Sequence, residues 1–157
     1  MNKPIIPFLW FDNQAEEAAV FYTSLFRNSG IDSISRYGKE GFEIHGQKEG
    51  TAMVVNFNIN GQSFSALNGG PIFKFNESIS LQVFCETQEE IDHYWGQLTK
   101  DGGQEGQCGW LKDKYGLSWQ IIPAILADLL SDPARAGRVT SAFLRMTKFD
   151  IDGLMKA

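Results

Sequence analysis

Hydrophobic and polar residues alternate along several short stretches of the chain, as they do in β-strands with one buried face. Residues 52–59 and 78–85 show the alternation most strictly. Asn60-Gly61 follows the first of these stretches and is a residue pair preferred in type I′ turns, so we expect a hairpin with residues 62–67 as the returning strand. Further strands are predicted at residues 4–11, 31–37 and 117–122, with a short one at 42–45 and a weaker one before Cys108.

Two longer segments carry apolar residues at helical spacing behind a capping residue. Asp12 or Asn13 is predicted to cap the first helix, which ends near Arg27. Thr87 with Glu90 has the spacing of a capping box for the second helix. Near the C-terminus, three more helices are predicted at residues 124–130, 133–147 and 150–156.

The two halves of the chain repeat the same order of features at an offset of 73 residues. A strand, a helix cap, an aromatic pair, a leucine and a terminal glycine coincide, so that Phe11 matches Phe84 and Leu25 matches Leu98. Such a repeat is typical of a duplicated module. The sequence therefore predicts a single α+β domain over residues 1–157. It consists of two βαβββ modules and a helical C-terminal extension, at about residues 4–68, 76–123 and 124–157.

The composition excludes several classes of partner. A net charge of −5 and a pI near 5.0 disfavour nucleic acids and anionic membranes. No apolar run approaches the roughly 18 residues that cross a bilayer, and the N-terminal residues lack the apolar core of a signal peptide. Cys85 and Cys108 match no metal or redox spacing. We therefore expect a cytoplasmic protein with no nucleic-acid or membrane partner.

Three motifs carry a resemblance to a known family: Phe-Tyr-x-x-Leu-Phe at 21–26, Cys-Gly-Trp-Leu-Lys-Asp at 108–113 and Gly-Leu-Ser-Trp-Gln-Ile-Ile-Pro at 116–123. Over residues 4–123 the chain resembles the glyoxalase/bleomycin-resistance (vicinal oxygen chelate) superfamily, in particular its PhnB-like branch, labelled 3-demethylubiquinone-9 3-methyltransferase. The resemblance implies that each module curls its sheet around a pocket, with its helix on the outer face. Asp113 and Gly116 bracket a tight turn, whose charged residues are expected to be solvated.

Strand alternation then predicts which side chains face the pocket. In the strand at 78–85 the polar set alternates with apolar residues that face the helix, and the turn assigns the polar Gln120 to the pocket side. By the repeat, Leu9 and Phe11 of the first strand are also assigned to the pocket side. Cys108 and Trp110, in the loop before the last strand, are added to the predicted pocket. The predicted ligand-binding residues are Leu9, Phe11, Asn56, Asn58, Ser78, Ser80, Gln82, Phe84, Cys108, Trp110 and Gln120.

The resemblance also implies where a metal ion is bound in metal-dependent members, which use His, Gln or Glu on four strands. The matching positions here are Pro7, Ser65 or Ala66, Ser78 or Ser80, and Gln120. Proline cannot ligate through its side chain, and serine hydroxyls are poor ligands for the divalent ions concerned. We therefore expect no metal ion and no cofactor.

Three functions remain open. The first is metal-free binding of a small molecule, and the second is an enzyme of unknown reaction that uses the pocket amides and Cys108. The third is an interaction protein with a vestigial pocket. No glycine-rich loop that would hold S-adenosylmethionine lies between the first strand and its helix. The apolar extension is expected to cover a sheet edge or a second subunit, and a homodimer is predicted.

Overall fold

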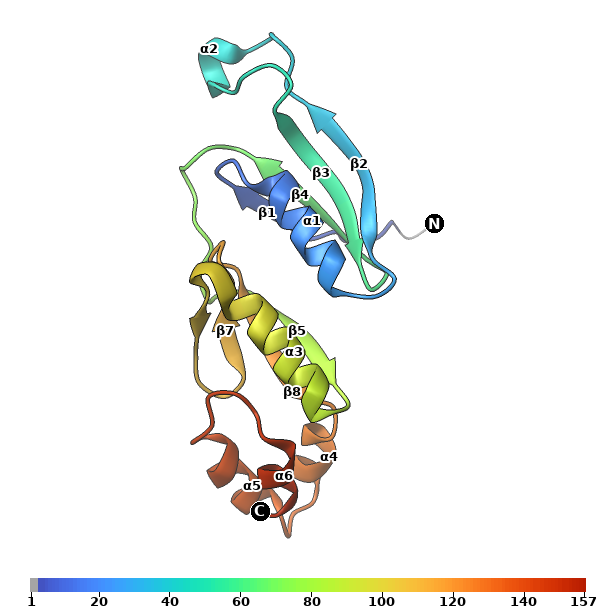
Figure 1. The fold of residues 1–157 in the computed structure, drawn as a ribbon, viewed down its shortest axis with the longest axis vertical. Coiled ribbons are helices and arrows are strands. Elements are labelled where there is room, and N and C mark those ends of the chain that lie inside the picture. The colour runs from blue at the N-terminus through green and yellow to red at the C-terminus, as the bar shows by residue number, and fades with distance from the viewer. Residues whose placement is uncertain (1–2) are drawn as a thin grey trace. The chain divides into compact units, whose positions relative to one another are not determined.

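The computed structural model describes residues 3–157 and divides into two compact units, Met1–Lys74 and Phe75–Ala157. Each unit contains one four-stranded sheet with a longer helix lying along it (Figure 1). This α+β arrangement of two modules is the predicted fold class. Within the described residues, no helix is long and apolar enough to span a bilayer.

The first unit has the predicted order strand, helix and three strands, with one short helix added. Its sheet has the order β1-β4-β3-β2, in which β1 runs parallel to β4 and the other pairs are antiparallel. The elements are β1 (Phe8–Phe11), α1 (Ala15–Leu25), β2 (Gly30–Arg36), α2 (Phe42–His45), β3 (Ala52–Ile59) and β4 (Gln62–Asn68).

The hairpin between β3 and β4 has the predicted turn. Asn60 and Gly61 have φ angles of +48° and +81°, and a type I′ turn needs positive φ at both of its central residues. The register runs without a break from the pair Ile59–Gln62 to the pair Val54–Leu67. The prediction of this hairpin is confirmed.

Helix α1 covers the face of the first sheet that carries its large apolar residues. Tyr22 of α1 lies with its ring centroid 6.4 Å from that of Phe57, which stacks on Phe64 of the neighbouring strand at 5.5 Å. Val55 and Ala66, two residues further along the same face, are also buried. Burying each such large side chain stabilises the fold by about 1.5–3 kcal/mol, so this face forms the core of the first unit.

The N-terminus of α1 is capped by a distant strand instead of by the residues before the helix. The N-cap residue is Gln14, whose side chain makes no capping hydrogen bond. Asn68, at the end of β4, takes over this role, because its Oδ1 accepts a hydrogen bond from the first helical N–H at 2.8 Å. The predicted cap at Asp12 or Asn13 is therefore wrong.

The segment Phe42–His45 forms the short helix α2, where the sequence predicts a strand. Gly41 and Gly46 flank it with φ angles of +75° and +67°, left-handed conformations that glycine adopts freely. His45 bonds within the same loop, through Nε2 to the Glu40 carbonyl and through Nδ1, which accepts from the N–H of Gln47, both at 2.9 Å. The His45 side chain therefore bonds within this loop, and residues 42–45 belong to neither sheet.

The second unit repeats the sheet of the first, in the order β5-β8-β7-β6 with β5 parallel to β8. The predicted strand at 78–85 begins two residues later than expected, and part of the predicted loop after Cys108 forms a strand that pairs with β8. The elements are β5 (Ser80–Cys85), α3 (Gln88–Thr99), the 3₁₀-helix η1 (Lys100–Gly102), β6 (Gln104–Glu105), β7 (Trp110–Lys112) and β8 (Ser118–Pro123).

Helix α3 begins as predicted. The side chain of Thr87 accepts a hydrogen bond from the N–H of Glu90 at 3.2 Å. The Glu90 carboxylate accepts a hydrogen bond from the N–H of Glu86 at 2.7 Å. In a standard capping box the donor is the N–H of the next residue, the N-cap itself. The hydrogen bond between Thr87 and Glu90 confirms the predicted cap. It could be predicted because all of its members lie within five residues of sequence.

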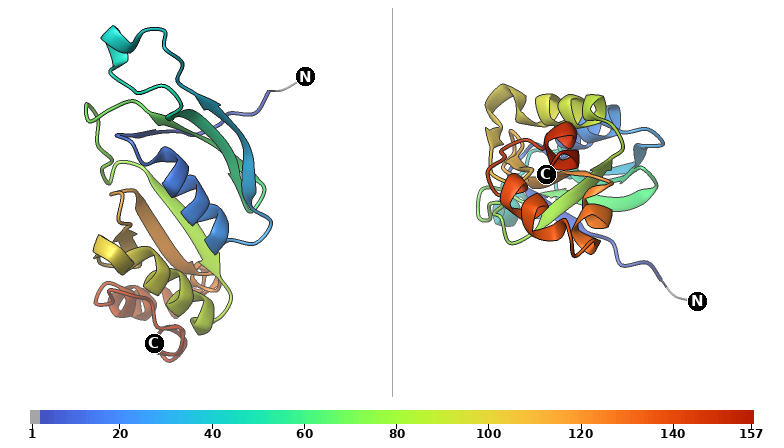
Figure 2. Two further views of the ribbon diagram at one scale, coloured as in Figure 1. Left: turned by 45° about the horizontal axis from the view of Figure 1, so that its top comes forward. Right: turned by 90° about the horizontal axis from the view of Figure 1, so that it is seen from below.

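The C-terminal extension packs on the second unit of its own chain. It consists of α4 (Leu126–Ser131), α5 (Ala136–Phe143) and α6 (Ile151–Met155), gathered at one end of that unit (Figure 2). The N–H groups of Cys108 and Gly109 donate to the carbonyls of Met146 and Thr147, each at 2.8 Å. Gln88 of α3 holds the next turn, through bonds to the carbonyl of Phe149 and the N–H of Ile151.

The middle helix of the extension is shorter than predicted. A helix at residues 133–147 is expected from the sequence, but α5 ends at Phe143, and the carbonyls of Met146 and Thr147 accept hydrogen bonds from Cys108 and Gly109. The N–H groups of residues 144–146 still bond back to α5, whereas these two carbonyls bond to the loop before β7 instead of to a further helical turn.

Candidate functional site

The open face of the second sheet carries most of the polar residues predicted for the pocket. α3 covers the other face, where Trp119 and Ile121 of β8 and Cys85 of β5 are buried. Alternation along paired strands puts the remaining side chains on the open face. They are Ser80, Gln82 and Phe84 on β5, Ser118, Gln120 and Ile122 on β8, and Trp110 and Lys112 on β7.

Three polar side chains on this face form a hydrogen-bonded ladder. Nε2 of Gln82 donates to Oε1 of Gln120 at 3.3 Å, and Nε2 of Gln120 donates to the hydroxyl of Ser80 at 2.8 Å. Gln82 and Gln120 are directly opposite each other in the register of β5 and β8. Gln82 is exposed and Gln120 is half-buried, so the ladder faces solvent along one side.

Apolar and aromatic side chains flank the ladder. Phe84 is 62% exposed, and its register partner is the half-buried Ile122. Trp110 of β7 is the register partner of Gln120 on the other side and is also half-buried. A planar or apolar group that lies on this face would contact these side chains while its polar atoms meet the amides.

The turn between β7 and β8 is built around the carboxylate of Asp113, which is only 2% exposed. Oδ1 accepts hydrogen bonds from the N–H groups of Tyr115 and Leu117, and Oδ2 accepts one from Nε1 of Trp119 at 2.9 Å. The expectation of a solvated side chain here is therefore wrong. Asp113 fixes Trp119, and through it the strand position next to Gln120.

Gly116 completes the same turn. Its φ angle is +87°, and its N–H donates to the carbonyl of Asp113 at 2.9 Å. The sequence signal for the buried carboxylate is the spacing of Asp, Gly and Trp in Asp-x-x-Gly-x-x-Trp; from Asp113 and Gly116 the sequence predicts a turn and the side of Gln120, but not a buried Asp113.

Ser78 lies before β5 and takes no part in the ladder. Its hydroxyl and its N–H both donate to Oδ1 of Asn76, at 2.5 and 2.9 Å. This bonding is local to the segment that precedes the strand. Of the predicted residues in the second unit, the structure thus places Ser80, Gln82, Phe84, Trp110 and Gln120 on one face and leaves Ser78 outside it.

Cys108 lies at the contact between the second sheet and the C-terminal extension. Its thiol donates to the carbonyl of Phe143 at 3.6 Å, and its φ angle is +56°. The other cysteine, Cys85, is buried beneath α3, and burial raises the pKa of its thiol to about 12, with the charges of Glu90 and Glu86 adding to the effect. Cys85 is therefore a neutral core residue.

In the first unit, Asn56 and Asn58 lie on the open face and belong to rows of hydrogen bonds across the strands. The hydroxyl of Ser65 donates to Oδ1 of Asn56 at 2.6 Å, and Nδ2 of Asn56 donates to Ser33 at 3.0 Å. Asn58 donates to Asp32 at 3.2 Å. These predicted polar residues are on the expected side of their sheet.

Leu9 and Phe11 lie on the helix-covered face of the first sheet, opposite to the prediction. They pair in register with Ala66 and Asn68, and Asn68 bonds to the start of α1. Both side chains are buried. The open face of β1 carries residues such as Phe8, which is exposed.

A difference of one residue between two connections explains this reversal. Three residues separate β1 from α1, whereas two separate β5 from α3. An offset of 73 therefore aligns the two helices, but the strand ends align at an offset of 74, so that Phe11 matches Cys85 instead of Phe84. Because side chains alternate along a strand, a shift by one residue moves each of them to the opposite face.

The side chains at the predicted metal positions are poor ligands. Ser65 bonds to Asn56, and Ser80 and Gln120 bond to each other, while Pro7 has no ligating side chain. Within residues 3–157, no group of three or more His, Cys, Asp or Glu side chains is arranged to hold an ion. The absence of a bound metal in solution stays a prediction.

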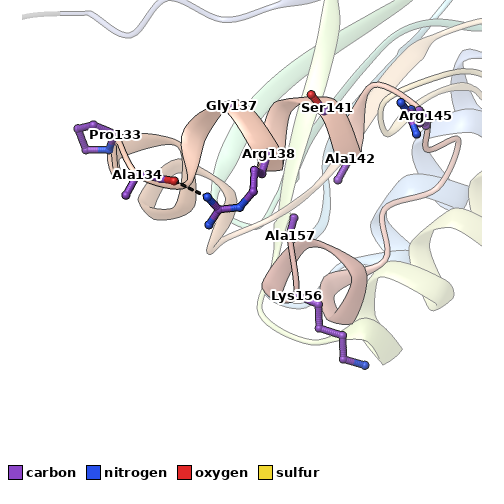
Figure 3. Close-up of a pocket in the computed structure, with 9 residues that line it drawn as sticks. All are labelled: Pro133, Ala134, Gly137, Arg138, Ser141, Ala142, Arg145, Lys156 and Ala157. Carbon is purple, nitrogen blue, oxygen red and sulfur yellow. Dashed lines mark hydrogen bonds between the residues drawn. The ribbon is translucent and has the colours of Figure 1, made fainter.

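A hollow of about 800 Å³ lies on the extension and is lined by residues of the extension (Figure 3). Its basic side chains do not converge: Arg138 bonds to the Ala134 carbonyl at 2.7 Å, whereas Lys156 points outward and pairs with Asp152. We do not assign a ligand to it, because nothing in its lining would hold one in a defined orientation. The lining residues are Pro133, Ala134, Gly137, Arg138, Ser141, Ala142, Arg145, Lys156 and Ala157.

A family model described as 3-demethylubiquinone-9 3-methyltransferase matches residues 3–122, which include both sheets except the last residue of β8. The chain belongs to this family. The family is part of the glyoxalase/bleomycin-resistance superfamily, as the sequence motifs predict. The match ends before the extension, so α4, α5 and α6 lie outside the part that the family shares.

Solved structures agree with this family and fold. A putative 3-demethylubiquinone-9 3-methyltransferase, the PhnB protein from Bacillus cereus, is 42% identical with a TM-score of 0.69, and the match covers 78% of this chain and 100% of that one. The fosfomycin resistance protein FosX from Listeria monocytogenes, solved with Mn(II) and sulfate, is similar in fold only, at 13% identity and a TM-score of 0.55 over 83% of this chain and 97% of that one. FosX from Mesorhizobium loti is similar at 9% identity and the same TM-score, over 84% and 99%. No curated protein matches the chain.

Proposed function

We propose that this family member binds a small organic molecule, without a metal ion, on the open face of the second sheet. The observation that carries the proposal is the ladder of Gln82, Gln120 and Ser80 next to the exposed ring of Phe84. A phenylalanine that is more than half exposed gains little by burial in the fold itself. A bound planar molecule would bury it and could bond to the amides at the same time.

The ladder keeps hydrogen-bonding capacity for such a ligand. Each glutamine amide has two N–H donors and one carbonyl acceptor, and the ladder uses one donor of each. The bonds between the glutamines and Ser80 also hold the amide planes in defined positions before a ligand arrives. Preorganised polar groups of this kind orient a ligand at a lower entropic cost than free side chains.

Methyl transfer, the reaction in the family's description, is not the function that we propose. The connections from strand to helix are Asp12-Asn13-Gln14 in the first unit and Glu86-Thr87 in the second. Neither contains glycine, and both therefore lack the glycine-rich loop expected for S-adenosylmethionine. The thiol of Cys108 is bonded to a backbone carbonyl, which gives it no base for nucleophilic attack.

We also propose that the chain acts as a homodimer in the cytoplasm. Large apolar side chains outside the proposed binding face remain exposed in each unit, Phe8 in the first and Ile79 in the second. A symmetric partner would cover a part of this apolar surface. Sedimentation at low micromolar concentration should then give about twice the monomer mass of 17.6 kDa.

The variant Gln120→Leu tests the binding proposal, with Gln62→Leu in the β3–β4 hairpin of the other unit as control. A thermal-shift screen of small aromatic compounds with polar substituents should yield ligands for the parent and for the control. Gln120→Leu should bind them at least tenfold more weakly, while its own unfolding free energy changes by less than about 1.5 kcal/mol. Equal binding by Gln120→Leu would exclude this face as the site.

A further inference from the structure

One row of side chains on the open face of the second sheet consists of hydrogen-bond donors, of which the Ser118 hydroxyl has no acceptor among the described residues and Lys112 pairs with an exposed carboxylate. The row consists of Ser80, Ser118 and Lys112, which are direct register partners on β5, β8 and β7. It lies next to the row of Gln82, Gln120 and Trp110, which in turn lies next to Phe84 and Ile122. The face thus changes along the strands from cationic and hydroxylic to apolar.

Ser118 is the unusual member of this row. Its side chain is 1% exposed, and its hydroxyl has no hydrogen-bond partner among the residues that the structure describes. A buried hydroxyl without a partner has lost its hydrogen bonds to water, and alanine would fill the same place without that cost. Such an orphaned group is explained when a ligand supplies the missing acceptor.

The direction of the ladder adds a second free donor. Gln82 donates to Gln120 and Gln120 donates to the oxygen of Ser80, so the ladder does not use the hydroxyl hydrogen of Ser80. Together with Ser118 and the ammonium of Lys112, the row offers three donors, one of them charged. Donors of this kind match an anionic acceptor with several oxygens.

A carboxylate of the chain itself already occupies the charged end of the row. Glu77 forms an ion pair with Lys112, and this contact holds the pKa of Glu77 below its usual range. The side chain of Glu77 is 61% exposed, and the residues around it, Asn76 to Ile79, are exposed as well. Phe75 lies near Gly116, so this segment runs past the turn at the start of β8.

We infer that the ligand of this face carries an oxyanion, either a carboxylate or a phosphate-type group, which displaces Glu77 from Lys112 and accepts hydrogen bonds from Ser80 and Ser118. The apolar body of the ligand then lies along Trp110 and Phe84. This inference rests on the proposed function and adds the chemical class of the ligand and its orientation. Glu77 acts as an internal substitute for the oxyanion when no ligand is bound.

Glu77 can be displaced at little energetic cost because the ion pair is partly exposed. Pairs at the surface contribute little to stability, since water screens both charges. A ligand oxyanion that reaches the Ser118 hydroxyl gains a bond that Glu77 does not make in the structure. The ligand oxyanion therefore competes successfully with the Glu77 carboxylate, because it bonds to Lys112, Ser80 and Ser118 together.

The test compares three probes of similar size: 3-phenylpropionate, phenyl phosphate and the neutral 3-phenylpropanamide. Binding to the whole protein is measured by isothermal titration calorimetry, or by chemical-shift titration for weak binding. We expect one or both anions to bind at least tenfold more tightly than the amide, and the preferred anion distinguishes a carboxylate from a phosphate-type ligand. Binding of the anion should weaken with added salt.

Variants of the row then test the assignment to these residues. Glu77→Gln removes the competing carboxylate and should tighten anion binding about three- to tenfold, whereas Ser118→Ala should weaken it by about the same factor. Amide binding should change by less than twofold in both variants. Lys39→Met and Ser141→Ala, exposed residues outside this face, serve as controls and should leave the affinities unchanged.

Three results would overturn the inference. The first is equal binding of amide and anions, and the second is anion binding that Glu77→Gln fails to tighten. The third is the absence of any probe binding, to the parent or to Glu77→Gln, at concentrations up to about 10 mM. In each case the proposed function still stands if neutral ligands from the screen lose affinity in Gln120→Leu, so the two failures are distinguishable.

Discussion

The carboxylate of Asp113 and the indole of Trp119 are joined by a buried hydrogen bond of 2.9 Å, six residues apart across the turn between β7 and β8. The same carboxylate accepts two backbone N–H groups of the turn. Trp119 therefore has a fixed position under α3, and the next residue, Gln120, is directed to the open face. A buried acid outside the ladder thus determines the geometry of the candidate site.

Replacing Asp113 by alanine should destabilise the protein by about 3 kcal/mol or more. Hydrogen bonds to a charged group contribute about 1.5–3 kcal/mol each, and the variant leaves the indole N–H and two backbone N–H groups without an acceptor. Urea denaturation measures the change. Asp128→Ala, an exposed aspartate in α4, is the control and should cost less than about 0.5 kcal/mol. Equal costs in the two variants would contradict a structural role for Asp113.

The cap of α1 gives a second prediction, in which the structure and the sequence name different residues. Asn68→Ala should lower the free energy of unfolding by about 2 kcal/mol, because it removes the acceptor for the first helical N–H and a donor to the carbonyl of Ala52. Asn13→Ala should cost less than about 0.5 kcal/mol, since Asn13 makes no cap. A larger loss of unfolding free energy in Asn13→Ala than in Asn68→Ala would show that the segment before the helix supplies the cap.

The two cysteines should differ in reactivity. Because burial raises the pKa of Cys85 to about 12, its thiol stays neutral in the folded protein. At about pH 8 an aromatic disulfide reagent should therefore modify Cys108 first, and both thiols should react in denaturant. The variant Cys108→Ser should lose the fast reaction. Fast modification of folded Cys108→Ser would show that Cys85 is accessible.

The same shift predicts a dependence of stability on pH. The thiol of Cys85 has an ordinary pKa of 9.0 in the unfolded chain and about 12 in the folded one. Below pH 9 the thiol is protonated in both states and contributes no pH dependence. As the pH rises from about 9 to 12, the thiol ionises only in the unfolded state. Ionisation stabilises the unfolded state, so the free energy of unfolding should fall over this range. The parent should lose more stability in this range than Cys85→Ala.

Removing Phe149 should detach the extension from the second sheet. Phe149 is 3% exposed, and its ring lies so close to Gly109 that a Cβ added there would approach it to 2.4 Å. Phe149→Ala should therefore cost about 3–5 kcal/mol, as large-to-small changes of buried aromatic residues do. Leu144→Ala, an exposed residue of the same extension, should cost less than about 0.5 kcal/mol. A small effect of Phe149→Ala would mean that the extension is held by its backbone bonds alone.

Much of the second unit could be predicted because its signals are local. The cap at Thr87 and Glu90 spans four residues, and the alternation in β5 assigns Gln82 and Phe84 to the open face without reference to the rest of the chain. The hairpin at Asn60-Gly61 is equally local, since positive φ at both residues defines its turn. For such features the sequence contains both partners of the interaction within a few residues.

The tertiary structure decided the features whose partners are distant in sequence. Asn68 caps a helix that begins 53 residues earlier, and Leu9 and Phe11 face α1 because β1 pairs with β4 in a register that the repeat misses by one residue. The ladder between Gln82 and Gln120 spans 38 residues. The sequence by itself determined the two modules, the family and the side that Gln120 faces, because periodicity and turn residues act over short distances. Only the folded chain decided which polar groups meet and which, like the hydroxyl of Ser118, are left without a partner, because that depends on the register of strands far apart in sequence.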